Sequence, residues 1–204
     1  SGRRVVLVVG MSRGVGAVLV AAAVVVSGCG PGDGEVTTTS PPPAAPVNPW
    51  DLPAEERPDL FDPCAEIPIE AVEEGAGSRL EVVDEFSNYR PGELISCGWQ
   101  NDEVHISILS TWKSKQEFLT DSSLFTLDPE SNSTGRPSVR MRERADSTDM
   151  GCFHLFFTEL GTVMFRLDLI STLDEFRGAR FVESCDALDE AAGQIAAYIP
   201  NGDF

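Results

Sequence analysis

The chain has 204 residues, of which 15 are Lys or Arg and 33 are Asp or Glu, so its net charge is −18. The predicted leader contains three arginines and no acidic residue, which leaves 12 basic and 33 acidic residues and a net charge of −21. This balance argues against nucleic acid as a partner and against docking on anionic lipid headgroups, because both require a positive surface.

Residues 1–28 are predicted to be a bacterial lipoprotein signal peptide. The run Val15–Val26 contains twelve small or apolar residues, which suits the apolar core of a signal peptide and is short for a membrane span of about 20 residues. A small Ser-Gly pair then precedes Cys29, the pattern at which the leader is cut before a cysteine that carries lipid. We expect a diacylglyceryl group on Cys29 to hold the protein at the extracytoplasmic face of the cell membrane. An uncleaved membrane anchor and a twin-arginine signal are the alternatives.

Residues 29–60 are predicted to carry the lipid and to form a Pro-rich tether. From Gly30 to Leu60 the chain holds eight of its fourteen prolines, and such a segment buries too little surface to offset the entropy of ordering it. Trp50 is the bulky apolar residue of this stretch. Either it packs back on the domain or it marks where order begins.

Residues 61–204 are predicted to form one α+β domain. Asp62 as an N-cap and Pro63 at the first helical position indicate a short helix that runs to about Glu74 and ends at a glycine-rich stop. Six stretches have the composition or the alternation of strands: 79–87, 94–100, 103–111, 138–145, 151–159 and 162–171.

The remaining elements complete a helix–sheet–helix order. Between the third and fourth strands, Lys115–Thr120 is expected to form a helical turn, and residues 121–135 a polar loop with Asp128-Pro129 inside it. A tight hairpin is expected where the last two strands meet at Leu160-Gly161.

A C-terminal helix is predicted at about 184–198 and ends at Pro200. Its apolar stripe has the spacing of one helix face and consists of Cys185, Leu188, Ala192, Ile195 and Ile199. The opposite side is expected to be polar and consists of Asp186, Asp189, Glu190 and Gln194. The predicted fold is therefore a single antiparallel β-sheet of about five or six strands, flanked by an N-terminal and a C-terminal helix.

Besides Cys29 the chain has four cysteines, Cys64, Cys97, Cys152 and Cys185. An even number in an exported chain favours two disulfides, for which three pairings are possible. We prefer Cys64–Cys97 and Cys152–Cys185, because each pair would join a terminal helix to a strand. Zinc ligands usually include a C-x-x-C pair, which is absent, so no metal is expected. Free thiols are the remaining alternative, and no cofactor is expected.

Three short motifs occur in a fixed order: Asp62-Pro63-Cys64, then Cys97-Gly98-Trp99, then Cys152 and Cys185 followed by Ile199-Pro200. With the leader, this pattern resembles an actinobacterial lipoprotein family whose domain has no known function, over about residues 61–200. The resemblance implies export, lipid anchoring and the cysteine pairing above, and it implies no catalytic residues. The helix–sheet–helix order is also similar to the α+β sandwich of the photosystem accessory protein and Mog1-like proteins.

His105 and His154 are the two histidines of the chain, and each lies in a predicted strand. A Ser-His-Asp site on either one is conceivable, since Ser and Asp are plentiful, but no G-x-S-x-G motif exists. A structural or surface role is favoured for both. The phenylalanines of the last two strands are expected to lie in the core, an apolar ligand cavity being the alternative: Phe153, Phe156, Phe157 and Phe165.

Arg140, Arg142 and Arg144 alternate on a predicted strand and would share one face, with Arg136 just before them. Because Arg suits the recognition of carboxylates and phosphates, the sharper hypothesis is a strip that docks an anionic ligand, such as a phospho-glycolipid headgroup, or an acidic partner. The alternative is cross-strand pairing with acids on neighbouring strands.

The sequence thus predicts a lipid-anchored cell-envelope protein, not an enzyme, that binds an envelope lipid, a glycolipid or a protein partner. An envelope hydrolase that uses His154 or His105 and a purely accessory subunit without a ligand are the alternatives. An apolar cavity beside the arginine strip would favour ligand binding. A cleft that holds a histidine within hydrogen-bond reach of a serine and an acid would favour the hydrolase.

Overall fold

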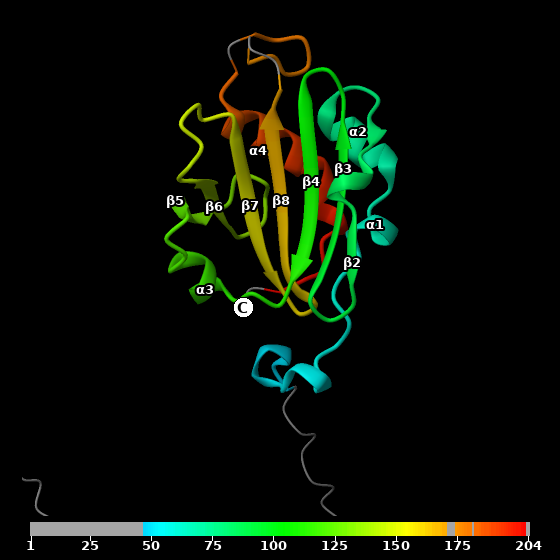
Figure 1. The fold of residues 1–204 in the computed structure, drawn as a ribbon, viewed down its shortest axis with the longest axis vertical. Coiled ribbons are helices and arrows are strands. Elements are labelled where there is room, and N and C mark those ends of the chain that lie inside the picture. Colours follow the sequence, from blue (N-terminus) through cyan, green and yellow to red (C-terminus); the bar gives the residue numbers. More distant parts are fainter. Residues whose placement is uncertain (1–46, 171–173, 181, 203–204) are drawn as a thin grey trace, which may run out of the picture. The chain divides into compact units, whose positions relative to one another are not determined.

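The computed structural model describes residues 47–170, 174–180 and 182–202, all within a compact unit that begins at Ala44. The predicted leader, Cys29 and the tether up to residue 46 lie outside the described residues. The unit is an α+β domain built on one antiparallel sheet of eight strands (Figure 1). Within the described ranges, no helix is long and apolar enough to cross a membrane.

The sheet has the order β1-β3-β4-β8-β7-β6-β5, and β2 pairs with β3 on the same side as β1. The strands are β1 (Glu81–Val82), β2 (Asn88–Arg90), β3 (Leu94–Gln100), β4 (Val104–Thr111), β5 (Leu124–Ser131), β6 (Ser138–Glu143), β7 (Gly151–Thr158) and β8 (Gly161–Leu169). The helices are α1 (Pro63–Glu66), α2 (Ile69–Ala76), α3 (Lys115–Leu119) and α4 (Ser184–Ile195), with 3-10 turns η1 (Pro49–Asp51), η2 (Ala54–Glu56), η3 (Asp84–Phe86) and η4 (Ala196–Tyr198).

Both faces of β7 are covered, and every residue of this strand is buried. Because side chains alternate along a strand, Cys152 and Phe156 lie on one face of β7, and Phe153 and Phe157 lie on the other. The first pair belongs to the larger core, which α1, α2 and α4 cover. The second pair belongs to a smaller cluster that includes Phe118 of α3 and apolar residues of β6.

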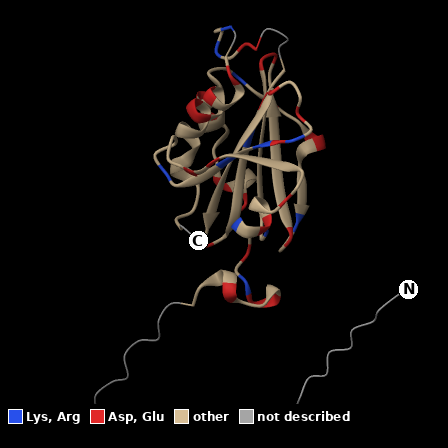
Figure 2. Cartoon of the chain, turned by 90° about the vertical axis from the view of Figure 1, so that its left-hand side faces the viewer, with Lys and Arg blue, Asp and Glu red and all other residues tan. Residues whose placement is uncertain are grey.

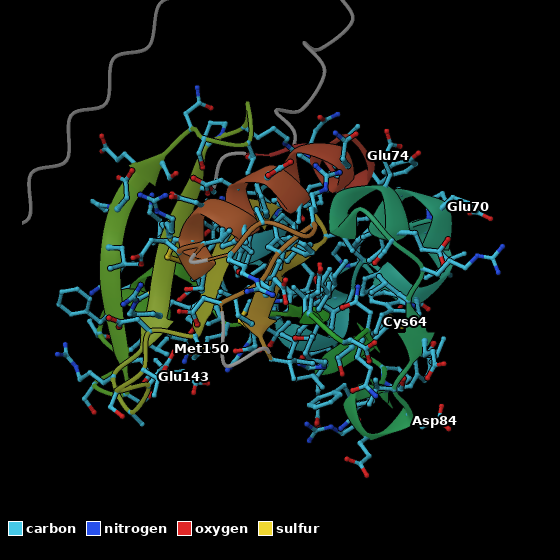
Figure 3. The ribbon with its side chains drawn as sticks, turned by 90° about the horizontal axis from the view of Figure 1, so that it is seen from above. Cys64, Glu70, Glu74, Asp84, Glu143 and Met150 are labelled. Atoms are coloured by element: carbon cyan, nitrogen blue, oxygen red, sulfur yellow. A yellow bond between two sulfur atoms is a disulfide. The ribbon has the colours of Figure 1, made fainter. Side chains whose placement is uncertain are left out.

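Helices α2 and α4 pack closely side by side on the sheet (Figure 3). Gly75 makes this approach possible, since a Cβ there would lie only 2.8 Å from the backbone oxygen of Ala191. Glu70 and Glu74 are exposed on α2 and mark its solvent side. The apolar stripe predicted for α4 is buried against the sheet and α2, and Leu188 and Ile195 are fully inaccessible to solvent.

Both preferred disulfides are confirmed. Cys64–Cys97 joins α1 to β3, and Cys152–Cys185 joins β7 to α4. Their Cα–Cα distances of 5.7 Å and 5.1 Å lie within the usual range for disulfides. Each terminal helix is therefore held on the sheet by a covalent link.

The α+β class and the single antiparallel sheet are confirmed, but the predicted count of five or six strands is wrong. One reason is that the stretch 79–87 is interrupted by η3, which separates β1 from β2. The polar loop expected at 121–135 is also wrong, because β5 lies there and pairs with β6. Pro129 is tolerated since β5 is an edge strand whose register shifts on both sides of Asp128.

The N-terminal helix is likewise two helices rather than one. Asp62 caps α1 as expected, its carboxylate accepting from the backbone N–H of Cys64 at 2.9 Å. Pro68 follows Ile67 directly, and the residue before a proline is disfavoured in helical conformation, so α1 ends there and α2 begins anew.

The β7–β8 hairpin forms where it was predicted and supports the N-terminal segment. Gly161 has a φ of +100°, and a Cβ there would lie 2.9 Å from the backbone oxygen of Thr111. Next to this turn, the indole Nε1 of Trp50 donates to the backbone oxygen of Thr158 at 3.0 Å. The same indole contacts Trp112 edge-on, with ring centroids 4.9 Å apart. Trp50 therefore packs back on the domain, the first of its two predicted alternatives.

Candidate functional site

Two neighbouring cavities open where α3, β5, β6 and the end of β7 meet. The larger has a volume of about 390 Å³ and is lined by Lys115, Pro129, Glu130, Ser131, Asn132, Pro137, Ser138 and Phe157. The smaller has a volume of about 200 Å³ and is lined by Asn48, Trp50, Ser114, Lys115, Gln116 and Phe157. They share Lys115 and Phe157, so we call them together the Lys115 groove.

The first turn of α3, which carries the exposed Lys115, is fixed by a capping box. The hydroxyl of Ser114 accepts from the backbone N–H of Glu117, and the Glu117 carboxylate accepts from the backbone N–H of Ser114 at 2.7 Å. The bond from the Ser114 backbone, followed by a second one that the Ser114 hydroxyl donates to the same carboxylate, lowers the pKa of Glu117. The carboxylate is therefore occupied by the cap. Lys115 Nζ lies 5.8 Å from the ring centroid of Phe157 and has no carboxylate partner among the described residues.

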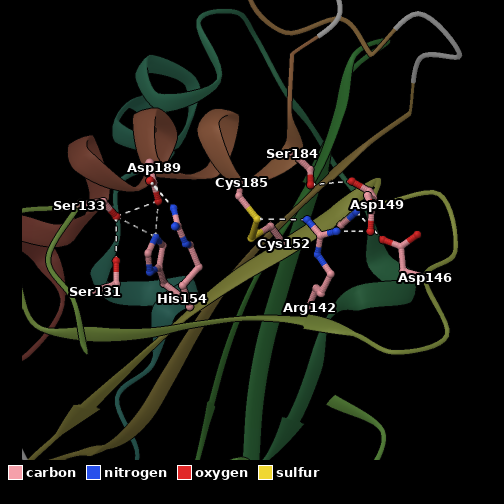
Figure 4. Close-up of a disulfide and its surroundings, with 12 residues drawn as sticks. Ser131, Ser133, Arg142, Asp146, Asp149, Cys152, His154, Ser184, Cys185 and Asp189 are labelled. Carbon is pink, nitrogen blue, oxygen red and sulfur yellow. Dashed lines mark hydrogen bonds and ion pairs between the residues drawn. A yellow bond between two sulfur atoms is a disulfide. The ribbon is translucent and has the colours of Figure 1, made fainter. Parts of the chain in front are cut away.

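A chain of hydrogen bonds leads from the groove wall to α4 (Figure 4). Ser138, which lines the groove, places its hydroxyl oxygen 2.9 Å from Nδ1 of His154. His154 Nε2 lies 2.7 Å from the Oδ1 carboxylate oxygen of Asp189. Ser133 donates to the same oxygen at 2.8 Å, and Arg140 donates to Oδ2 at 2.9 Å. We call these five residues the His154 network.

The electrostatics of the network keep Asp189 ionised. Burial raises the pKa of this carboxyl group, but hydrogen bonds from His154 and Ser133 outweigh burial and hold the pKa below its ordinary value. A carboxylate only accepts hydrogen bonds, so Nε2 of His154 carries a proton. In the neutral ring, Nδ1 then accepts from the hydroxyl of Ser138.

The network contains the three groups of a Ser-His-Asp site, but in an unusual arrangement. Asp189 contacts Nε2 and Ser138 contacts Nδ1, the reverse of the order in the serine proteases. His154 is fully inaccessible to solvent, and Ser138 is 5% exposed. The same contacts also join β6, β7 and α4, which is a structural task.

The four arginines of the predicted strip reach different parts of the domain. Arg136 donates to backbone oxygens at the end of the chain, among them that of Ile199 at 2.5 Å. Arg140 belongs to the His154 network, and Arg142 pairs with Asp149 and approaches the sulfur of Cys185 at 3.6 Å (Figure 4). Arg144 donates to the backbone oxygen of Ser122 at 3.1 Å. The acids that pair with Arg140 and Arg142 lie on α4 and in the β6–β7 loop, not on neighbouring strands. Anion capture by these arginines stays a prediction.

His105 lies on the other face of the sheet, against the ring of Phe86 at a centroid distance of 3.9 Å. Its Nδ1 is 3.6 Å from Asp168, and its buried Nε2 has no hydrogen-bond partner in the described part of the chain. Burial raises the pKa of Asp168, but hydrogen bonds from His105 and Arg166 lower it below its ordinary value. No serine hydroxyl in the described ranges is bonded to His105, so this histidine has an acid but no nucleophile.

The family described as Protein of unknown function (DUF3558) matches residues 24–198. This chain belongs to that family. No curated protein and no solved structure matches the chain. The resemblance to a domain of unknown function is thus confirmed over most of this DUF3558 chain, and the groove and the network described above both lie within the matched residues.

Two further properties of this DUF3558 domain bear on ligand binding: the distribution of its charged side chains and the grouping of side chains that could bind a metal ion. Asp and Glu are spread over the helices, strand ends and loops in the view of Figure 2, and Lys and Arg are fewer. Among the residues that the structure describes, no group of three or more His, Cys, Asp and Glu side chains could hold a metal ion.

Sequence reasoning missed the residues that matter most here. Asp189 was expected on the polar side of α4 but faces His154, because β6 and the β5–β6 loop also contact this helix. Lys115 and Phe157 are 42 positions apart and become neighbours only through the packing of α3 against β7. The Ser-x-x-Glu spacing of Ser114 and Glu117 was the one local signal here, since it indicates that a helix begins at Lys115.

Proposed function

We propose that this chain is a lipid-anchored cell-envelope protein that binds a ligand in the Lys115 groove without transforming it. The observation that carries the proposal is the pair of cavities that meet at Lys115 and Phe157. The larger cavity falls within the range of about 300–1,000 Å³ that is usual for small-molecule sites, and the smaller one extends it. Apolar walls with a few polar groups are likewise usual for such sites.

The lipid anchor rests on the leader and on the resemblance to actinobacterial lipoproteins. Cys29 carries the lipid. Because Trp50 packs on the domain, the tether that remains is residues 30–46, and it lets the domain stand about 23 Å from the membrane as a flexible coil and up to ~53 Å away when extended. Replacing Cys29 with Ser is expected to move the protein from the membrane pellet to the soluble fraction of the host. An unchanged distribution would contradict the anchor.

Native mass spectrometry tests the binding function. The oxidised full chain carrying Cys29→Ser, which cannot be acylated, is exposed to an envelope extract of the host and then weighed. A retained adduct of defined mass is expected.

A matched pair of variants locates the ligand in the groove. Gln116→Trp places an indole in the smaller cavity, and Leu119→Trp places one on the same helix at an exposed position outside the groove. The adduct is expected to disappear in the first variant and to persist in the second. An unliganded chain, or an adduct that both variants retain equally, would overturn the proposal.

The His154 network favours a second candidate, an envelope hydrolase with Ser138 as nucleophile. In this scheme the Ser138 oxygen bonds to an ester carbonyl carbon while its proton passes to Nδ1 of His154. The proton then moves to the leaving alcohol as the ester bond breaks, and water releases the acyl group from Ser138 by the same route. Asp189 orients the ring throughout and keeps the proton on Nε2.

A fluorophosphonate probe distinguishes this candidate from simple binding. The hydrolase requires that the probe phosphonylates Ser138, that Ser138→Ala abolishes labelling and that Ser131→Ala leaves it intact, all followed by intact mass and peptide mapping. Absence of labelling in the oxidised chain would remove the hydrolase from consideration and leave the binding function untouched.

A further inference from the structure

The apolar surface of the Lys115 groove extends over both of its cavities. Phe157 lies between the two cavities, with Pro129 and Pro137 on one side and Trp50 on the other. The Nε1 donor of Trp50 is already bonded to the backbone oxygen of Thr158. The indole surface that remains for the smaller cavity is therefore apolar. An elongated apolar chain would contact both sides of this groove.

Lys115 is unusual among the basic residues of the domain. Of the twelve Lys and Arg residues after the leader, all of them described, ten make a hydrogen bond or an ion pair with another group, and only Lys115 and Arg79 do not. An unpaired cation at the junction of two cavities, in a protein that is strongly acidic overall, favours an anionic group on the ligand.

The charge around the groove also limits how many anionic groups the ligand carries. Glu130 lines the larger cavity and would repel a second negative charge near its wall. The hydroxyl of Ser138 is engaged by His154, and that of Ser131 by Ser133 at 3.2 Å, so neither is an unoccupied donor for a multiply charged headgroup. The groove therefore matches one anionic group beside Lys115.

We infer that the ligand is a single-chain amphiphile with one anionic group, represented by a long-chain carboxylate. The carboxylate lies beside Lys115 Nζ, and the apolar chain lies over Phe157 between the prolines and Trp50. This inference rests on the proposed function, because it names the class of ligand that the groove binds.

Quenching of Trp fluorescence by dibrominated stearate tests the inference on the full chain carrying Cys29→Ser. Bromine quenches at short range, so a chain lying beside Trp50 quenches that indole, and a Trp50→Phe variant identifies its share of the signal. The methyl ester of the same fatty acid lacks the charge and serves as the uncharged probe.

Lys115→Gln is expected to weaken stearate binding about tenfold, the value of one charge-assisted hydrogen bond. Arg79→Gln makes the same charge change at the other unpaired cation, outside the groove, and is expected to leave binding unchanged. An unchanged thermal midpoint of Lys115→Gln confirms that folding is intact. A dibrominated phosphodiester lipid is expected to quench Trp50 more weakly, because it carries two chains.

Three outcomes would overturn the inference: no quenching of Trp50, equal affinity for the methyl ester, or equal loss of affinity in Lys115→Gln and Arg79→Gln. If stearate does not bind, but the envelope extract yields an adduct that Gln116→Trp abolishes, the proposed function stands and only the ligand class is wrong. If neither stearate nor the extract yields a complex, both fail together.

Discussion

Replacing Asp189 with Ala removes the acceptor at the centre of the His154 network. The Nε2–H of His154, fully buried, would lose its acceptor at 2.7 Å and keep only the Ser133 hydroxyl at 3.4 Å, which costs about 1–3 kcal/mol. Arg140 would lose a partner in an ion pair whose two side chains are 26% and 22% exposed, so solvent screening limits this loss to about 1 kcal/mol. The higher helix propensity of Ala returns about 0.5 kcal/mol. The expected loss of unfolding free energy is therefore about 1.5–3.5 kcal/mol.

Glu190→Ala is the matched control, because it removes the neighbouring acid of the same helix. Glu190 pairs with Arg177 on the solvent side of α4, where the side chains are 55% and 33% exposed. Such surface pairs contribute about 0–1 kcal/mol. Of these two acids, only Asp189 is hydrogen-bonded to β6 and β7, so the two variants separate the network from general effects on helix charge.

Thermal unfolding at pH 7 under non-reducing conditions measures the difference. For a domain of this size, 1 kcal/mol corresponds to about 2–4 °C, so Asp189→Ala is expected to lower the Tm by about 3–14 °C. Glu190→Ala is expected to change it by less than about 4 °C. Equal shifts in the two variants would refute the view that the His154 network holds α4 on the sheet.

Other perturbations probe the packing, the acid stability and the covalent links. Leu188→Ala opens a cavity at a fully buried position and is expected to cost about 3 kcal/mol, measured by urea unfolding; a cost below about 1 kcal/mol would mean that α4 does not pack as described. Since the folded-state pKa of Asp189 lies below its ordinary value of 3.8, the stability that its ionised form provides is complete above 3.8 and is lost as the pH falls below that value through the folded-state pKa. The Tm of Asp189→Asn should therefore depend less steeply on pH below about pH 4 than that of the unsubstituted chain, and parallel curves would contradict this origin of acid sensitivity. The double change Cys152→Ala and Cys185→Ala opens a loop of 33 residues and is expected to cost about 3–4 kcal/mol in chemical unfolding, whereas an unchanged midpoint would show that the link constrains little. Gly161→Ala forces a side chain into a left-handed turn against the backbone of Thr111 and is expected to lower the Tm by several degrees. A variant that melts at the same temperature as the unsubstituted chain would disprove this.

The elements that sequence reasoning identified correctly are those whose pattern is local. The alternation Val104, Ile106 and Ile108 predicts β4, because the inward face of a strand recurs every second residue. The stripe through Leu188 and Ile195 predicts α4 in the same way, with the helical period. The two disulfides were predicted from the even number of cysteines besides Cys29 and from their placement on helices and strands.

β5 and the His154 network escaped the same reasoning for different physical reasons. β5 contains Asp128-Pro129 and irregular pairing, which an edge strand tolerates because half of its hydrogen-bonding groups need no partner strand. The helical period tells which residues of α4 share a direction, but not how wide an arc of the helix is covered. Asp189 lies inside that arc only because β6 and the β5–β6 loop extend over the side of the helix.

The sequence by itself determined the fold class, the covalent links and the acidic character of the chain. These properties depend on composition, on short periodicities and on residues near one another in the chain. Tertiary structure alone decided the Lys115 groove, whose walls come from Asn48, Trp50, α3, β5, β6 and Phe157. Segments so far apart in sequence carry no local pattern that records their contact, since only the strand order β7-β6-β5 and the packing of α3 bring them together.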